Sequence, residues 1–445
     1  MTTTMTTSDL SVKINLQPLQ RHKATYPLTP VQAKSIKQRM LDWANQFSIL
    51  LFLDSNNYPS VYSGYECLLA AGAVSSNSEC HLTSLQQLHN ASHDWVFGHI
   101  SYDHKNLLEP KLTSGHPVKT GFPLLYFFIP QTVCHINREQ TILTIESFDD
   151  PGVIYRSINE TPVSPVVKMP TLQFTSVIDK DSYMETIAKL RRHIADGDCY
   201  EINFCNEGFC ENTDVASLQV FNALNALSPA PFAAYYRLED KYMMCASPER
   251  YLRKEGDKIL SQPIKGTARR DKDLLKDEEI KEALRNDIKE HAENVMIVDL
   301  VRNDLARCCE TGSVLVNELF GIYSFPQVHQ MVSTVCGKLK AGVPFTDAIR
   351  YSFPMGSMTG APKYKVMQLI ENYERSARGL FSGTVGYITP GGDFDFNVII
   401  RSLFYNAATR YLSYQTGGAI TYDSDPQREW DETRLKAWAL ERIFS

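Results

Sequence analysis

Four glutamates in the C-terminal part of the sequence are spaced as two pairs that could hold a divalent metal. Glu290 and Glu293 lie three residues apart in KEHAENVMIVDLVRND, and Glu429 and Glu432 repeat that spacing in REWDETRLKA. Residues at i and i+3 share one face of a helix, where like charges repel unless a cation lies between them. An all-oxygen set suits Mg²⁺ rather than zinc or di-iron. Either pair alone is also typical of a solvated acidic helix face.

A lysine in the pentapeptide Pro263-Ile264-Lys265-Gly266-Thr267 is a candidate nucleophile. An amine reacts only when it is neutral, and burial or a neighbouring cation favours the neutral form. Taken alone, a lysine between a proline and a glycine is typical of a solvated turn.

Two glycine-containing segments could contribute to a binding site. We predict that Thr416-Gly417-Gly418-Ala419 is a turn after a strand, whose backbone N–H groups can face an anion or simply close a hairpin. The segment GSMTGAPK, residues 356–363, is not a nucleotide-binding loop, because only three residues separate its glycines and a proline precedes its lysine. Pro362 indicates a helix start, and Ser357 or Thr359 could donate to a ligand.

These groups must be positioned by helices and strands, and the apolar spacing predicts both. Expected helices cover 182–196, 272–307, 363–378 and 427–443. Expected strands cover 47–53, 95–100, 123–129, 140–147, 383–389, 394–404 and 411–415. Strands interspersed with long one-sided helices indicate an α+β layered fold.

The length of 445 residues exceeds the size at which one hydrophobic core stops growing, so two domains are expected. The proline-rich stretch 161–170 is the predicted linker. We therefore expect a β-rich N-terminal domain at 1–165 and a second domain at 175–445.

Composition narrows the class of protein. A net charge of -6 gives no basic surface for nucleic acid, and the longest apolar runs are too short for a membrane helix. The opening MTTTMTTSDL lacks the features of a secretion signal and is predicted to be a disordered tail. The ten cysteines form no C-x-x-C pair, so a zinc site or disulfide framework is not expected. We expect a cytoplasmic protein that needs a local positive site for any anionic substrate.

Nine segments resemble one family in sequence and in order. They are SPER (247–250), PIKGT (263–267), KEHAENVMIVDLVRNDLAR (289–307), FPQVHQMVSTV (325–335), GSMTGAPK, GTVGY (383–387), IIRS (399–402), QTGGAI (415–420) and DSDPQREWDETRLKA (423–437). This set closely resembles the chorismate-binding enzymes over residues 180–445. Residues 1–160 resemble them more loosely, through WVFGHISYD at 95–103. The resemblance implies two large twisted antiparallel β-sheets packed face to face, with helices outside and the active site between the sheets.

The residue at position 265 indicates which reaction of the family the resemblance implies. In that family, anthranilate synthase component I usually has alanine at this position, whereas aminodeoxychorismate synthase component I has lysine. The resemblance thus implies formation of 4-amino-4-deoxychorismate from chorismate and ammonia for folate and 4-aminobenzoate synthesis. Anthranilate synthesis, an isochorismate synthase-type reaction and a non-catalytic chorismate-binding module remain alternatives. No glutaminase segment is recognisable, so a glutamine amidotransferase subunit is the expected partner.

The resemblance also assigns roles to individual residues. It implies that Glu249 is the general acid for the departing C4 hydroxyl and that the Lys265 amine adds at ring C2. The four glutamates would form the Mg²⁺ shell, with Glu293 and Glu432 as the direct ligands. The substrate-binding set would be Gly266, Thr267, His329, Ser357, Tyr387, Arg401, Gly417, Gly418, Ala419 and Lys436.

Within that set, Arg401 and Tyr387 would hold the enolpyruvyl carboxylate, while His329 and Ser357 would line the ring.

Two departures from the family pattern stand out. Glu201, in DCYEINF, occupies a position where the aminating enzymes commonly have glutamine and isochorismate synthases a lysine that activates water. The missing lysine argues against isochorismate synthesis. Ala419 replaces the usual last glycine of its segment. Family members can hold tryptophan in the N-domain, and Leu53-Asp54-Ser55 resembles that strand only loosely, so a regulatory site stays open.

Overall fold

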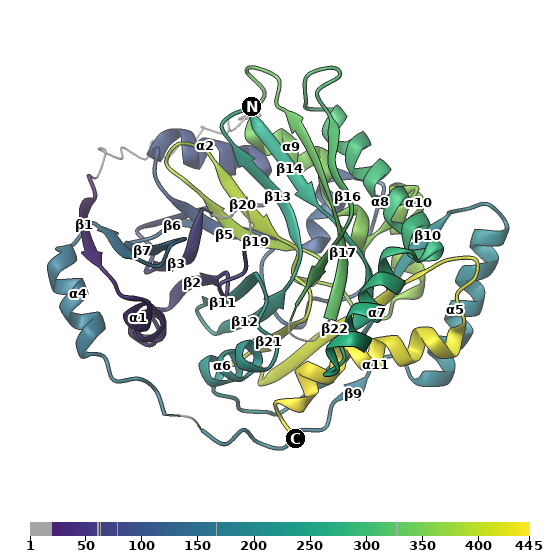
Figure 1. Cartoon of the computed structure of the whole chain (residues 1–445), viewed down its shortest axis with the longest axis horizontal. Helices are drawn as coiled ribbons and strands as arrows, with labels where there is room; N and C mark the ends of the chain where they lie inside the picture. Colours follow the sequence, from purple (N-terminus) through teal and green to yellow (C-terminus); the bar gives the residue numbers. More distant parts are fainter. Residues whose placement is uncertain (1–19, 60–61, 63, 78, 166, 326–327) are drawn as a thin grey trace, which may run out of the picture.

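The computed structural model describes residues 20–59, 62, 64–77, 79–165, 167–325 and 328–445. The predicted N-terminal tail therefore lies outside the described residues. In the described part of the chain, 22 strands form two sheets, and every pairing between them is antiparallel (Figure 1).

The larger sheet has 12 strands within the described ranges. Its order is β1 (His22–Pro27), β8 (Ile142–Ser147), β7 (Thr132–Asn137), β3 (Tyr65–Ala71), β2 (Ile49–Asp54), β11 (Phe232–Leu238), β12 (Lys241–Ser247), β21 (Ser402–Asn406), β22 (Tyr411–Ile420), β10 (Glu201–Cys210) and β18 (Gly360–Ala361), with β9 (Thr175–Ser176) beside β10.

The smaller sheet has ten strands among the described residues. Its order is β15 (Ile264–Arg269), β17 (Val328–Lys338), β14 (Lys258–Gln262), β13 (Arg250–Glu255), β20 (Phe394–Asn397), β19 (Thr384–Ile388), β5 (Val96–Ile100), β6 (Leu125–Ile129) and β4 (Ser75–Asn77), with β16 (Leu315–Ser324) beside β17.

Helices lie on the outer sides of the two sheets (Figure 1). They are α1 (Pro30–Ala44), α2 (Leu82–Ser92), α3 (Lys105–Leu108), α4 (Pro151–Glu160), α5 (Lys180–Ala195), α6 (Ser217–Leu227), α7 (Leu274–Arg285), α8 (Ile288–Ala306), α9 (Phe345–Ser352), α10 (Lys363–Tyr373) and α11 (Pro426–Arg442). Two short 3₁₀ segments cover Tyr102–His104 and Gly356–Met358. Among the described residues, no helix is long and apolar enough to cross a membrane.

The principal core lies between the sheets. Phe97 and Phe396 of the smaller sheet share one buried cluster with Leu51, Tyr236 and Met243 of the larger sheet. A second buried cluster joins the outer face of the larger sheet to α1, α4, α6 and α11. Burying the apolar faces of both sheets against each other is the main stabilising contribution to this arrangement. The predicted α+β fold with two face-to-face antiparallel sheets is confirmed.

Three predictions about elements were wrong. The single helix expected over 272–307 is two helices, because the Asp287 side chain accepts from the N–H groups of Lys289 and Glu290 and starts α8 afresh. The strand expected over 394–404 is interrupted between β20 and β21, where Arg401 has a positive φ of 51°. The segment 416–419 is no turn but belongs to the C-terminal part of β22, where its four residues pair with residues 203–206 of β10.

The two segments that we expected to be domains share both sheets. β2 pairs with β11 in the larger sheet, and β5 pairs with β19 in the smaller sheet. Between α4 and β9, the described residues contain no helix or strand, which fits a connecting segment at 161–170. The domain boundary between residues 165 and 175 stays a prediction. Strands from both sides of that boundary share the same two sheets.

Candidate active site

Lys265 lies in a bulge of strand β15. Ile264 pairs with Val332 and Thr267 with Gln330, so two residues of β15 oppose one residue of β17. Gly266 has a φ of +90°, a conformation that side chains other than glycine rarely adopt. A bulge of this kind re-aims a side chain out of the regular pleat. Here it brings the Lys265 ammonium to 2.5 Å from a carboxylate oxygen of Glu201, the first residue of β10 in the other sheet.

The charge state of Lys265 follows from its surroundings. The residue is 8% exposed, and burial alone opposes its charge. The carboxylates of Glu201, Glu293 and Glu249 outweigh burial and raise the pKa of Lys265 above its usual value. These carboxylates therefore favour the ammonium form of Lys265. Addition to a substrate requires that it first lose a proton.

Glu249 is placed as a buried acid. It is 4% exposed, and the Ser357 hydroxyl donates to its Oε1 over 2.7 Å. Burial raises the pKa of Glu249 to about 7, against the opposing effects of Ser357 and Lys265. A carboxyl group with a pKa near the working pH can donate a proton to a leaving group. This environment matches the role that the sequence resemblance implied for Glu249.

The loop that carries Ser357 is held from several sides. The Asn203 side-chain amide donates to the Ser357 carbonyl over 3.0 Å, and the Arg378 guanidinium donates to the neighbouring Met358 carbonyl over 2.6 Å. Arg378 is itself paired with Glu374 at 2.6 Å, and both are buried. Because each polar group in this network has a partner, the network can fix the Ser357 hydroxyl beside Glu249.

The four glutamates come from two helices, Glu290 and Glu293 from α8 and Glu429 and Glu432 from α11. Burial raises the pKa of Glu293 to about 7 and also raises the pKa values of Glu290 and Glu429. The negative charge of Glu432 on α11 repels that of Glu290 on α8, which further raises the pKa of Glu290. The Lys436 ammonium, 2.7 Å away, lowers the pKa of Glu432, whose side chain is half exposed.

The four glutamates offer carboxylate oxygens, the kind of ligand that a divalent cation such as Mg²⁺ prefers. Glu429 is 6% exposed, and its Oε2 has no hydrogen-bond partner among the described residues. A buried carboxylate oxygen without a partner is costly, and a bound cation would satisfy it. Within the described ranges, however, no three metal-binding side chains are already gathered at one point. The four glutamates face one region without forming a finished coordination shell.

Cationic and backbone groups adjoin the glutamates. Lys436 donates to the Gly417 carbonyl over 2.7 Å, in addition to its ion pair with Glu432. A Cβ on Gly418 would lie 2.9 Å from Glu429 Oε2, so the β22 backbone runs directly beside the acidic pair. Ala419 pairs with Asn203 in an ordinary strand register. Burial lowers the pKa of Arg401 while Glu249 opposes that effect, so this guanidinium belongs to the same electrostatic neighbourhood as the acid.

The His329 imidazole has partners at both ring nitrogens. Nδ1 lies 2.8 Å from the Ser324 hydroxyl, and Nε2 lies 3.1 Å from Asp277 of α7. Its neighbour Gln330 is the residue across from Thr267, and the buried Gln330 Oε1 has no partner in the described part of the chain. Gln330, which sequence analysis missed, therefore offers an unpartnered acceptor next to Thr267, while both ring nitrogens of His329 already have partners.

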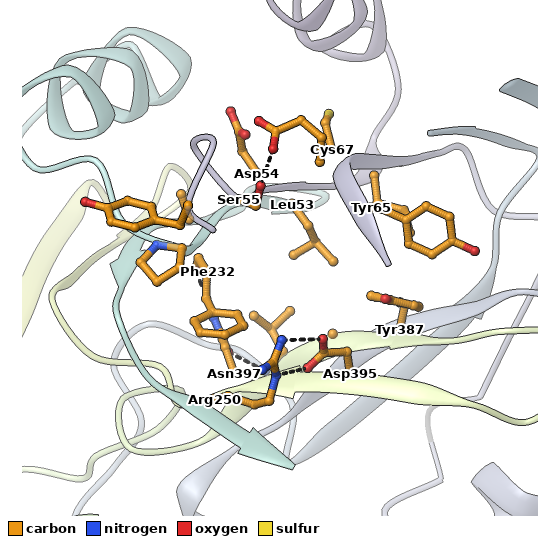
Figure 2. Close-up of a pocket in the computed structure, with 17 residues that line it drawn as sticks. Leu53, Asp54, Ser55, Tyr65, Cys67, Phe232, Arg250, Tyr387, Asp395 and Asn397 are labelled. Carbon is orange, nitrogen blue, oxygen red and sulfur yellow. Dashed lines mark hydrogen bonds and ion pairs between the residues drawn. The ribbon is translucent and has the colours of Figure 1, made fainter. Parts of the chain in front are cut away.

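Tyr387 is not brought to this group of residues. It lines a separate cavity of about 70 Å³ between the sheets, together with Leu53, Ser55, Tyr65 and Arg250 (Figure 2). Figure 2 shows Arg250 held by two hydrogen bonds to Asp395 on the same wall as Tyr387, with Leu53 and Ser55 across the cavity. The expected contact of Tyr387 with a substrate carboxylate has no support in this geometry.

Sequence analysis missed two further contributors. Glu201 was noted only as a departure from a pattern, yet it is fully buried and bonded to Lys265. Lys289 was not considered, although its ammonium acts on all four glutamates. Lys289 is four residues before Glu293, a spacing that places both on one helix face and that could have identified it.

Comparison with known proteins identifies the class to which this site belongs. Residues 50–442 match the family model for chorismate binding enzymes. The chain therefore belongs to the chorismate-binding enzyme family.

Individual relatives agree. An anthranilate synthase component I-like protein of Synechocystis is 33% identical over 82% of this chain and 75% of its own length. Aminodeoxychorismate synthase component 1 of Bacillus subtilis is 31% identical over 78% of this chain and 76% of its own length. The crystal structure of anthranilate synthase component I from Streptococcus pneumoniae has the same fold, with a TM-score of 0.74 at 24% identity over 86% of this chain and 94% of that one.

Proposed function

We propose that this chain carries out the component 1 reaction of aminodeoxychorismate synthesis, in which chorismate and ammonia give 4-amino-4-deoxychorismate and water. The observation that carries the proposal is the buried Lys265, aimed between the sheets at Glu201 and acted on electrostatically by the acid Glu249. The curated Bacillus subtilis relative with this activity supports it. A lysine in this place gives the site a nucleophile of its own.

The proposed chemistry has two steps. Neutral Lys265 adds to ring C2, the ring double bond shifts, and the C4 hydroxyl leaves as water with the proton of Glu249. Ammonia then adds at C4, the double bond shifts back, and Lys265 leaves C2 as an amine. The proton that the new C4 ammonium sheds returns to Glu249. Covalent addition divides one difficult displacement into two easier ones.

Binding of the dianionic substrate falls to the other groups. We propose that Arg401, Lys436 and the backbone at 417–419 face its carboxylates, that Ser357, Gly266 and Thr267 contact the rest of the molecule, and that His329 lines the ring side through its position in β17. Glu290, Glu293, Glu429 and Glu432 would hold Mg²⁺, with Glu293 and Glu432 as direct ligands. The metal, when bound, would neutralise negative charge shared by the glutamates and a substrate carboxylate.

Ammonia would come from a glutamine amidotransferase subunit, as the numbering of components in the relative's name suggests. The product would feed 4-aminobenzoate and folate synthesis. We propose a cytoplasmic location, because all ten cysteines carry free thiols, as expected in a reducing compartment.

One incubation tests the proposed function. Purified protein with chorismate, Mg²⁺ and ammonium salt should give 4-amino-4-deoxychorismate, separated and identified by chromatography and mass spectrometry. Omission of Mg²⁺ should abolish turnover, and glutamine should replace ammonium only after an amidotransferase is added. Anthranilate or isochorismate as the main product would overturn the assignment in favour of those reactions.

The variant Lys265→Ala sharpens the same test. It removes the nucleophile but leaves the metal and carboxylate-binding groups, so chorismate binding should persist while 4-amino-4-deoxychorismate formation falls by at least about 100-fold. Direct attack of ammonia at C2 would then shift residual product toward 2-amino-2-deoxyisochorismate or anthranilate. If the variant keeps the wild-type rate and product, Lys265 is not the nucleophile.

A further inference from the structure

A cavity of about 520 Å³ lies on the outer face of the larger sheet, where α1 and α6 also lie (Figure 1). Its floor is one cross-strand row, in which Arg237 of β11 pairs with Tyr242 of β12, and Tyr242 pairs with Tyr405 of β21. Asn45, at the C-terminal end of α1, and residues 216–219, at the start of α6, complete this part of the lining. Volumes of about 300–1,000 Å³ are typical of small-molecule sites.

The start of α6 presents backbone donors to this cavity. Its N-cap residue is Ala216, which has no side chain that can accept a hydrogen bond from the first turn. The first bond within the helix runs from the Val220 N–H to the Ala216 carbonyl, so the N–H groups of residues 217–219 precede it. Serine, threonine, aspartate or asparagine would normally cap such an end. An uncapped helix start attracts an anion, because its N–H groups and the helix dipole both favour negative charge.

Gln219 is an independent feature that points to a ligand. It lines the cavity and is only 9% exposed. Its side-chain amide has no hydrogen-bond partner in the part of the chain that the structure describes. A glutamine at the third position of a helix can fold back to the N-cap N–H, but this one does not. Because an unpartnered buried amide is costly, a bound molecule that accepts its hydrogen bond would be stabilised.

Arg237 supplies positive charge on the floor of the cavity. Its Nε and Nη1 donate to the carbonyl oxygens of Glu239 and Asn45 over 3.1 and 2.8 Å. Both acceptors are backbone carbonyls, so they orient the guanidinium without neutralising it. The guanidinium lies 5.5 Å from the centre of the Tyr242 ring, and that ring stacks on Tyr405 with centroids 6.0 Å apart. The floor therefore offers a cation directly beside a flat aromatic surface.

We propose that this cavity is a ligand site separate from the candidate active site and that it binds a small aromatic monocarboxylate. The carboxylate accepts from the first turn of α6, the Gln219 amide and the Arg237 guanidinium, and the ring packs on Tyr242. Asp214 also lines the cavity, with a side chain that is 73% exposed and pairs with Arg410 at 2.6 Å. Its negative charge favours a ligand with one charge over a phosphate, which carries about 1.5–2.

The experiment measures benzoate binding to the whole chain by saturation-transfer NMR titration. Arg237→Gln removes a charge-assisted hydrogen bond and should raise the Kd about tenfold. Gln219→Leu keeps the size of the side chain without its amide and should raise the Kd about threefold. The Tm of Gln219→Leu should not fall, because that amide bonds nothing within the described chain. A merely structural glutamine would do the reverse, lowering the Tm and leaving the Kd unchanged.

Two matched variants control for charge and for binding elsewhere. Arg191 of α5 donates to the Tyr422 carbonyl over 3.0 Å and does not line the cavity. Arg191→Gln therefore removes one positive charge and should leave the Kd unchanged. Arg401→Gln alters the candidate active site and should keep the same benzoate binding.

Two further probes test the class of ligand. Cyclohexanecarboxylate carries the same charge without a flat ring, so it should bind at least about threefold more weakly than benzoate. Inorganic phosphate at an equal concentration should not displace benzoate. Equal binding of cyclohexanecarboxylate, or displacement by phosphate, would overturn the aromatic monocarboxylate assignment.

The remaining outcomes decide the site itself. It is overturned if wild type shows no saturable benzoate binding, or if Arg237→Gln and Gln219→Leu both keep the wild-type Kd. Binding that is lost in Arg401→Gln but kept in Arg237→Gln would place benzoate in the candidate active site and overturn it equally. If Arg237→Gln does not fold, Gln219→Leu decides alone. None of these measurements uses turnover, so failure of the proposed function would leave their result unchanged.

Discussion

Glu249 and Lys265 show how one buried environment acts on two ionisable groups. Burial disfavours the charged form of both side chains. For Glu249, burial outweighs the neighbouring hydroxyl and cations, so its pKa rises to about 7. Lys265 has Glu201 within ion-pair distance, so its pKa rises as well and it keeps its proton. These surroundings thus favour a proton on the nucleophile and, below about pH 7, a second proton on the acid.

The pKa of Glu249 predicts a pH dependence for adduct formation. The reacting form needs Glu249 protonated and Lys265 neutral. Above about pH 7 the protonated fraction of Glu249 falls as steeply as the neutral fraction of Lys265 rises, so the rate should rise with pH up to about pH 7 and level off above it. Single-turnover measurements without ammonia test this, because the protonation of ammonia then plays no part. Glu249→Gln should be inactive at every pH. A wild-type rate that keeps rising to about pH 9 would show that Glu249 is not the proton donor.

At the residue scale, spacing in the sequence singled out the two glutamate pairs, whereas Glu249 came from the family resemblance alone. The four glutamates, Lys265 and Glu249 form one electrostatic neighbourhood, because the charge of each acts on the pKa of at least one other. Residues in strands were harder, because a shift of one position moves a side chain to the other face. Gln330 illustrates this, because its unpartnered Oε1 was not predicted from the sequence, and Tyr387 lies in a different cavity.

At the element scale, the Gly417 segment has a steric role in addition to its expected contact with substrate. Gly417 pairs with Cys205, and a Cβ at residue 417 would lie 2.3 Å from the Phe204 carbonyl oxygen and 2.6 Å from Cys205 Sγ. Contacts that short do not occur in folded proteins, and a strand interior gives the backbone little room to shift. The glycine allows β22 to lie close against β10, the strand that carries Glu201.

We therefore expect Gly417→Ala to destabilise the protein by about 1–3 kcal/mol, the usual cost of overpacking a core. Thermal unfolding followed by circular dichroism should show a lower Tm. Gly391→Ala is the control, since its nearest non-neighbouring atom would be 3.9 Å away and the Tm should not change. An unchanged Tm in Gly417→Ala would mean that the β10 and β22 backbones separate at no cost.

Helices were predicted more accurately than their interruptions. The helix expected over 427–443 is Pro426–Arg442, and that expected over 182–196 is Lys180–Ala195. Apolar spacing fixes the face of a helix but says little about a break between two helices that share a face. The sequence signal for the break before α8 is Asp287, a residue type that commonly caps the start of a helix. Gly417 and Gly418 led to the wrong prediction of a turn, because glycine is favoured both in turns and where two strands pack closely.

At the scale of the whole molecule, the shared sheets predict how fragments will behave. A chain of residues 175–445 would lack β2 and β5, which leaves β11 and β19 with open edges inside the sheets. Open hydrophobic edges promote aggregation. We expect this fragment to elute in the void volume on size-exclusion chromatography when expressed alone, and to form a defined complex when co-expressed with 1–165. A monomeric, folded 175–445 fragment would show that the C-terminal segment is an independent domain.

The fold class could be predicted because strand runs and one-sided helices leave few layered arrangements. The order of strands could not, because hydrophobic patterns identify strands without identifying their neighbours. Nothing in the sequence of β5 indicates that its partner on one side is β19, since that pairing depends on the tertiary core around Phe97.

The pairing of β5 with β19 also governs how the protein is made. Ile100 pairs with Thr384, and 384 − 100 leaves a separation of 284 residues. At translation rates of about 5–20 residues per second, β5 would wait roughly 15–60 s for its partner to leave the ribosome. The acidic pair of α11 is made later still. A nascent chain therefore exposes a half-built sheet during this interval, and unpaired strand edges of that kind are prone to aggregation.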